Sequence, residues 1–120
     1  MRTSQHTSPT RRKPAAALKA RAAVFAALGD ETRLSVLAKL SSGTPHSIAR
    51  LTAGTRLTRQ AVTKHLCVLR DAGVVRSVRA GRETLFALQL KPLDEARSYL
   101  DAVSRQWDEA LGRLKAFVEE

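Results

Sequence analysis

The last quarter of the chain carries apolar side chains that recur every seven residues. One series is Leu93, Leu100, Trp107 and Leu114, and a second, offset by three, is Ala96, Val103, Ala110 and Phe117. This repeat predicts a single helix from Pro92 to about Val118 with an apolar seam along one side. Such a helix is roughly 40 Å long at 1.5 Å per residue, and the body of a 120-residue chain is too small to cover it. The seam therefore predicts a partner, and a second copy of the chain is the simplest one.

The first helix is expected to begin at Pro14. Pro14 suits the first turn of a helix, and the Ala-rich stretch from Ala15 to Leu28 has apolar residues at helical spacing. Aromatic residues make up only 4% of the chain, so the core must be aliphatic and thin. Association buries surface that such a monomer cannot. The expected dimer interface on the last helix comprises Leu93, Leu100, Val103, Trp107, Leu111 and Leu114.

Positive charge is concentrated before the last helix. The chain has 21 Lys and Arg against 11 Asp and Glu, and residues 1–92 hold 17 of the basic but only 4 of the acidic side chains. A basic body followed by an acidic helix predicts a polyanionic partner for the body. Residues 1–13 are too polar to bury and are expected to form a disordered basic arm. This arm either follows phosphates or acts as a solubilising tail.

Three further helices are expected between the first and the hairpin described below. Asp30 is a good N-cap for a helix from Glu31 to Leu40, and a short helix follows at about Ser47 to Ala53. After the turn Gly54 to Leu57, Thr58 is expected to cap a helix over about residues 59–72. The turn has the length found in a helix-turn-helix, whose second helix can enter a major groove. The expected inward residues are Leu34, Leu37, Ala38 and Leu40 in the earlier helix, and Val62, Leu66 and Leu69 in the later one.

The hydrophobic period changes after Gly73. Val74 to Arg79 is rich in β-branched residues and alternates around a basic face, Ala80 to Arg82 forms a turn, and Thr84 to Leu88 returns as a second strand. This pattern predicts a β-hairpin over about residues 74–88 with arginine at its tip. The expected fold is therefore mainly α with a small β-hairpin wing. It is a winged helix-turn-helix over residues 14–120 with long N- and C-terminal dimerisation helices.

The outward face of the helix over residues 59–72 has side chains suited to reading DNA. Arg and Lys pair with guanine O6 and N7, Gln pairs with adenine, and Thr can contact a thymine methyl group or a phosphate. Arginines on the hairpin would lie along the backbone or reach the minor groove. The expected DNA-binding residues are Arg59, Gln60, Thr63, Lys64, Arg70, Arg76, Arg79 and Arg82. A solvated amphipathic helix followed by an ordinary hairpin is the alternative, and the co-occurrence of these features with the basic charge favours DNA.

Two segments resemble the ArsR/SmtB family of bacterial winged-helix repressors. Leu28 to Leu37 (LGDETRLSVL) is similar to the family's opening motif, and Leu57 to Val75 (LTRQAVTKHLCVLRDAGVV) to its recognition helix and the run into the wing. Gly81 and Arg82 stand where the family has its wing turn. The resemblance implies a homodimer that is joined through the first and last helices and binds an imperfect inverted repeat. It thereby adds Leu18 and Phe25 of the first helix to the expected dimer interface. It also implies DNA contacts from Gln60, Thr63 and Lys64 and phosphate contacts from the wing arginines.

The sequence departs from the metal-sensing members of that family. No Cys lies at Ser47 to Gly54, the last helix has no His, and no pair among the three histidines has ligand spacing. We therefore expect no metal site and no cofactor. The chain looks like the branch with Trp107, Leu111 and Leu114 on its last helix, in which an inducer is generally unknown.

Three single residues have a structural and a functional interpretation. His65 could reach a phosphate, but a half-buried histidine hydrogen-bonded to backbone is favoured. Cys67 could be a thiol switch beside Lys64 and Arg70, but a lone Cys is more often a small tolerated residue. Trp107 is expected to anchor the dimer rather than bind a ligand.

The expected function is sequence-specific DNA binding by a homodimeric transcriptional repressor. The alternative is a non-specific architectural DNA-binding protein or an RNA-binding protein, whose affinity would be nearly independent of sequence. No nucleophile with a base, carboxylate pair or metal cluster is visible, so an enzyme is not expected and no catalytic residue is assigned. No apolar run approaches the ~20 residues of a membrane span, and no signal peptide is visible, so a cytoplasmic protein is expected.

Overall fold

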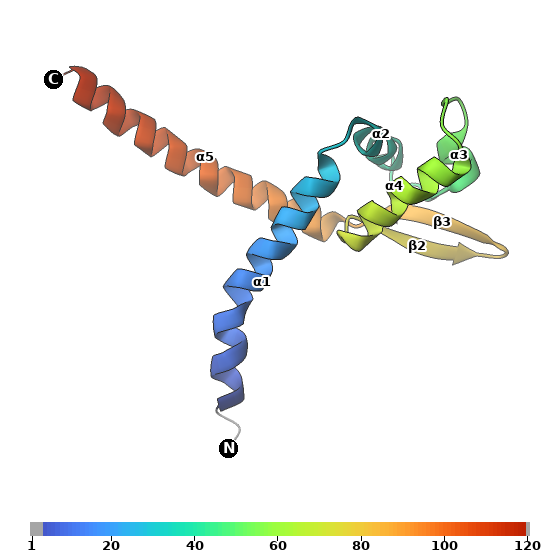
Figure 1. Cartoon of the computed structure of the whole chain (residues 1–120), viewed down its shortest axis with the longest axis horizontal. Coiled ribbons are helices and arrows are strands. Elements are labelled where there is room, and N and C mark those ends of the chain that lie inside the picture. Colours follow the sequence, from blue (N-terminus) through green and yellow to red (C-terminus); the bar gives the residue numbers. More distant parts are fainter. Residues whose placement is uncertain (1–3, 120) are drawn as a thin grey trace.

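The computed structural model describes the backbone of residues 4–119 and the side chains of residues 15–119. The elements of this part of the chain are mainly helices, with a small antiparallel sheet whose hairpin lies between the fourth and fifth helices of the chain (Figure 1). This arrangement confirms the predicted mainly α fold with a hairpin wing. In chain order the elements are α1 (Ser4–Leu28), α2 (Glu31–Leu40), β1 (His46–Ser47), α3 (Ile48–Thr52), α4 (Arg59–Asp71), β2 (Val75–Ala80), β3 (Glu83–Leu88) and α5 (Leu90–Glu119).

Side-chain caps fix where the three central helices begin. The carboxylate of Asp30 accepts a hydrogen bond from the backbone N–H of Arg33 at 3.0 Å, and the hydroxyl of Thr58 accepts one from Ala61 at 3.0 Å. Ser47 caps α3 in the same way. Each cap satisfies a backbone donor that has no partner within its helix. The predicted caps at Asp30 and Thr58 are confirmed.

The core lies where α4 packs against α1, α2, α3 and β2. Its side chains are aliphatic, as the composition predicts, and Val62, Leu66 and Leu69 of α4 are fully buried. The predicted stripe of α2 is partly wrong, because Leu34 is 52% exposed and Ala38 is also exposed. The buried residues of α2 are instead Val36, Leu37 and Leu40.

The wing is the β2–β3 hairpin, and it projects from the body on the side away from the free end of α5 (Figure 1). Its strands pair antiparallel from Val75 opposite Leu88 to Ala80 opposite Glu83. Gly81 takes φ +63° in the two-residue turn between them, a conformation that glycine adopts without strain. A third strand, β1, pairs with β3 through His46 opposite Phe86, giving the order β1-β3-β2. The sequence analysis did not predict β1.

The helix α1 begins at Ser4, within the segment for which the sequence predicts a disordered arm, and the disorder of this arm stays a prediction. Residues 1–3 lie outside the described residues. The prediction rested on polarity, which argues against burial but not against helix.

The helix α5 starts at the body and then leaves it (Figure 1). It begins at Leu90, so Pro92 lies in the first turn, where its missing N–H costs no helical hydrogen bond. Ala96 is buried against the core, whereas every residue from Ser104 to Glu119 is exposed. Within residues 4–119 no helix combines the length and the hydropathy needed to cross a membrane.

Candidate nucleic-acid interface

The helix-turn-helix unit consists of α3, α4 and the turn between them. Its second helix, α4, lies across the body with its polar side outward. Gly54 takes φ +77° in this turn, and the hydroxyl of Thr55 donates to the carbonyl of Thr52 at 2.6 Å. These contacts fix the direction in which α4 leaves the turn. The nearby amine of Lys39 donates to the carbonyl of Leu51 at 3.1 Å, so this lysine is used within the fold.

The predicted readout residues lie outside the buried stripe of α4, and Gln60 and Lys64 lie opposite it. Arg59, Gln60 and Lys64 are exposed. Thr63 is half-buried, and its hydroxyl donates to the carbonyl of Arg59 at 2.7 Å, so its oxygen is available to DNA as an acceptor only. Arg70 is exposed near the far end of α4, where its guanidinium lies 3.7 Å from Sγ of Cys67. The structure thus brings four of these residues to the N-terminal part of α4 and leaves Arg70 apart from them.

The arginines of the wing do not share one face. Arg76 and Arg79 are both exposed on β2 and stand three positions apart. Because successive residues of a strand point to opposite sides, these two side chains lie on opposite faces of the hairpin. The side chain of Arg79 reaches Thr84 on the paired strand at 3.5 Å. Arg82 is exposed in the turn. The predicted alternation around one basic face is therefore wrong, and the hairpin presents positive charge on both sides and at its tip.

Two further basic residues belong to the same surface and were not predicted as DNA contacts. Arg50 on α3 and Arg56 in the turn before α4 are both exposed. Their position within the helix-turn-helix, next to the expected recognition helix, is a signal that the sequence already contained. Phosphate contacts from the first helix and the turn position such a unit on DNA.

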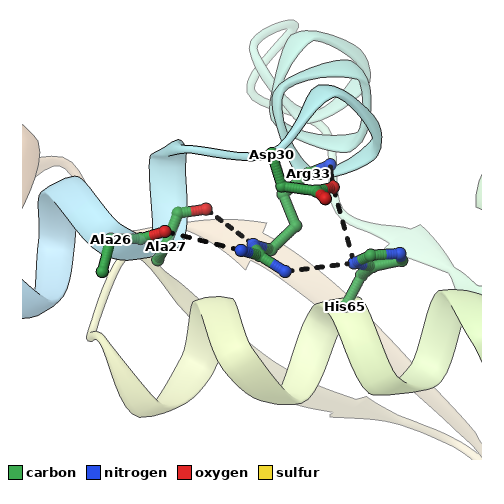
Figure 2. A network of polar contacts seen from close by, with 5 residues as sticks. All are labelled: Ala26, Ala27, Asp30, Arg33 and His65. Carbon is green, nitrogen blue, oxygen red and sulfur yellow. Dashed lines mark hydrogen bonds and ion pairs between the residues drawn. The ribbon is translucent and has the colours of Figure 1, made fainter.

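A polar network joins α4 to the corner between α1 and α2 (Figure 2). Arg33 donates from Nε to the carbonyl of Ala27 at 2.7 Å and from Nη2 to that of Ala26 at 3.4 Å, and its Nη1 lies 3.4 Å from Nδ1 of His65. The same Nδ1 lies 3.8 Å from Oδ2 of Asp30. The pKa of the Asp30 carboxyl is lowered chiefly by the hydrogen bond that it accepts from the backbone N–H of Arg33. The positive charge of the Arg33 guanidinium acts in the same direction.

The sequence analysis predicted only part of this network. His65 is half-buried, as expected, but its partners are side chains rather than backbone groups. Arg33 stands one helical turn before Val36 and Leu37, and His65 stands three residues after Val62. Both polar residues therefore lie on the inward faces of their helices, and this position was the signal for a buried contact between them.

The expected dimer residues divide into two groups. Leu18, Leu100, Trp107, Leu111 and Leu114 are more than half exposed, and so are Phe117 and Val118. Phe25 and Leu93 pack against the core of their own chain, and the ring of Phe25 lies 6.1 Å from that of Tyr99, which also carries the guanidinium of Arg21 at 5.3 Å. Val103 is half-buried. The start of the seam thus packs within the chain, and from Leu100 onward the seam is exposed except at the half-buried Val103.

The remaining candidates form no reactive centre among the described residues. Cys67 is a half-buried free thiol. Within the described part of the chain, no three His, Cys, Asp or Glu side chains gather closely enough to hold a metal ion. The absence of a metal site stays a prediction.

An exposed polar helix after a short turn, followed by an arginine-bearing hairpin, defines the class of winged helix-turn-helix DNA-binding proteins. Comparison with known families matches residues 28–78 to a helix-turn-helix domain. An uncharacterised HTH-type transcriptional regulator of Bacillus subtilis, YuzN, is 40% identical in an alignment of 77 residues that covers 59% of this chain and 84% of that protein.

Solved structures agree. An ArsR-like transcriptional regulator from Rhodococcus sp. RHA1 superimposes with a TM-score of 0.74 at 34% identity, over 83% of this chain and 93% of that one. The homodimeric winged helix-turn-helix DNA-binding domain of a possible ArsR-family regulator from Mycobacterium bovis gives 0.61 at 27% identity, over 85% and 90%. The chain belongs to the ArsR family of winged helix-turn-helix transcriptional regulators.

Proposed function

We propose that the chain is a homodimeric repressor that binds an inverted-repeat operator in double-stranded DNA. The observation that carries this proposal is the outward face of α4. The side chains of Arg59, Gln60 and Lys64 are exposed and make no hydrogen bond within the described part of the chain. On the inward face, Val62, Leu66 and Leu69 hold the helix against the core. A rigidly packed helix with free Arg, Gln and Lys side chains is suited to reading base edges in a major groove.

Phosphate contacts would come from around this helix. The wing carries Arg76, Arg79 and Arg82, and Arg50 and Arg56 lie in the helix-turn-helix. A hairpin with arginines on both sides can contact the DNA backbone from one side while the other reaches toward the minor groove. Arg70, at the far end of α4, is suited to a phosphate at the edge of the site rather than to a base.

The dimer would form through the open part of α5 together with α1. Eight large apolar side chains are more than half exposed on the described parts of these two helices in the protomer, including Trp107 and Leu111. Apolar surface of this extent on a small protein favours association with a partner, and the M. bovis relative is homodimeric. A symmetric dimer would present two copies of α4, and thus two half-sites. Membership of this family supports repression as the effect of binding and the cytoplasm, where the operator would lie, as the place of action.

Selection from a pool of random duplexes tests this proposal. We expect one sequence family with two-fold symmetry, bound at least ~10³ times more tightly than random DNA. Binding that favours no sequence and weakens steeply with salt would show a non-specific architectural protein instead. An asymmetric winner would contradict the homodimer.

A further inference from the structure

We infer that Arg33 is a positioning residue for the recognition helix, and that it holds α4 through His65 only while His65 is neutral. This inference rests on the proposed function, because it concerns how well α4 is placed to read DNA. Neither residue is expected to touch a base.

Arg33 is placed to join three elements. Its backbone N–H is bound by the N-cap Asp30, which fixes the start of α2. Its guanidinium donates to two carbonyls at the C-terminal end of α1, at Ala26 and Ala27. The remaining amino group points at His65 in the middle of α4 (Figure 2). A planar guanidinium can hold several acceptors in fixed directions, which a lysine amine cannot do. The corner between α1 and α2 is thereby tied to α4.

The contact between Arg33 and His65 requires one protonation state. Arginine is a donor only, so Nδ1 of His65 must act as an acceptor, and the proton of the neutral ring must sit on Nε2. The other neighbour of the same Nδ1 is the carboxylate of Asp30 at 3.8 Å, which is an acceptor only. Nδ1 thus lies between an obligatory donor and an obligatory acceptor.

Protonation of His65 would exchange these partners. The new N–H on Nδ1 cannot accept from Arg33, and the imidazolium would lie next to a guanidinium, whereas Asp30 would attract it. From α1 only the carbonyls of Ala26 and Ala27 join the network, and among described polar contacts no charged group of α3 or β2 reaches His65. Lys64 precedes His65 on α4 and is exposed. The tie between Arg33 and α4 is therefore lost when Nδ1 of His65 takes up a proton.

The α1 end of this network connects it to the proposed dimer helices. Ala26 and Ala27 close α1, and Phe25 in the same turn contacts Tyr99 of α5. A change in the hold of Arg33 on α4 therefore alters how the recognition helix is oriented relative to α1 and α5. Specific binding requires both copies of α4 to be placed correctly, whereas non-specific binding by charge does not. We expect acidification to lower specificity rather than general affinity for DNA.

The first test needs no DNA. His46 provides an internal comparison, because its Nδ1 lies 2.6 Å from the carbonyl of Thr44 and must donate. Long-range ¹H–¹⁵N spectra of the full-length chain at about pH 8 should show opposite tautomers, with the proton on Nε2 in His65 and on Nδ1 in His46. In the Arg33→Lys variant the Nδ1 signal of His65 should move and that of His46 should not. A proton on Nδ1 of His65, or a signal unaffected by Arg33→Lys, would overturn the inference.

The second test measures specificity against pH. The probes are the two-fold symmetric duplex recovered by selection and a shuffled duplex of the same composition. Between about pH 8 and pH 5.5 the ratio of the two affinities should fall roughly three- to ten-fold for the wild-type chain, the equivalent of one ordinary hydrogen bond. His65→Gln should flatten this profile, and the control His46→Gln should leave it as in the wild type. A ratio that rises on acidification would instead mean that protonated His65 contacts DNA, and would refute the inference.

The two tests separate the inference from the function on which it rests. If selection yields no preferred duplex, the proposed function fails, while the tautomers still report whether Arg33 holds neutral His65. If a preferred duplex is found but the pH profile of the wild type is flat, the proposed function stands and the inference fails.

Discussion

Replacing Trp107 by alanine should dissociate the dimer while leaving the protomer folded. The side chain of Trp107 is 68% exposed in the protomer, so its burial there contributes little to folding. Covering a large aromatic side chain removes about 150–250 Å² from water, and about two-thirds of that is open at Trp107. At ~25 cal/mol per Å² this is about 2.5–4 kcal/mol for each protomer, and a symmetric dimer has two such residues.

Only part of this free energy appears as affinity, because association also costs entropy and ordering of side chains. We therefore expect the dissociation constant of the dimer to rise at least ~100-fold, which corresponds to about 2.7 kcal/mol. Sedimentation equilibrium over a concentration series measures this constant directly. Arg105 lies two residues before Trp107, off the seam and exposed, so Arg105→Ala is the matched control. A Trp107→Ala chain that sediments as the wild type does, or an equal loss in Arg105→Ala, would refute the position of the seam.

Three further changes probe the recognition unit. Gln60→Ala and Lys64→Ala should each weaken binding to the selected duplex without altering the dimer. Gln60→Ala should also relax the preference at one base pair by about 1–3 kcal/mol. Unchanged affinity and sequence preference in a repeat selection would remove these residues from the interface. Thr58→Ala deletes the N-cap of α4 and should lower the free energy of unfolding by about 1 kcal/mol in urea titration, whereas an unchanged midpoint would show that the cap is not needed. The pKa of Asp30 lies below its ordinary value of 3.8, chiefly through the N–H of Arg33, so its contribution to stability is complete above that value and is lost as the pH falls through the lowered pKa. Melting temperatures between about pH 5 and pH 2.5 should therefore drop more steeply for the wild type than for Asp30→Asn, and equal slopes would contradict this.

Local rules predicted the elements that have strong local signals. Caps at Asp30 and Thr58 and the hairpin around Gly81 depend on residues close in sequence, and the structure has them where they were expected. The two-residue strand β1 could not be predicted, because it is too short to show a period and exists only by pairing with β3. The predicted inward face of α2 was displaced by one residue, because it included the apolar Leu34 and left out the charged Arg33. The buried residues Val36, Leu37 and Leu40 lie on the same face of the helix as Arg33.

The candidate site was predictable to a similar degree. The exposed residues of α4 follow from subtracting its buried stripe, which the sequence shows plainly. The division of the α5 seam was not predictable, since a heptad pattern does not show which apolar residues pack within the chain and which stay open. The contact between Arg33 and His65 spans 32 residues and depends on how α1, α2 and α4 meet, which only the tertiary structure reveals.

The central claim is that two recognition helices of one dimer read two half-sites on the same face of the duplex. A hydroxyl-radical footprint on the selected duplex tests it directly. We predict two protected patches related by two-fold symmetry, with centres about one helical turn (~10 base pairs) apart. A single protected patch, or protection spread evenly along the duplex, would contradict the account.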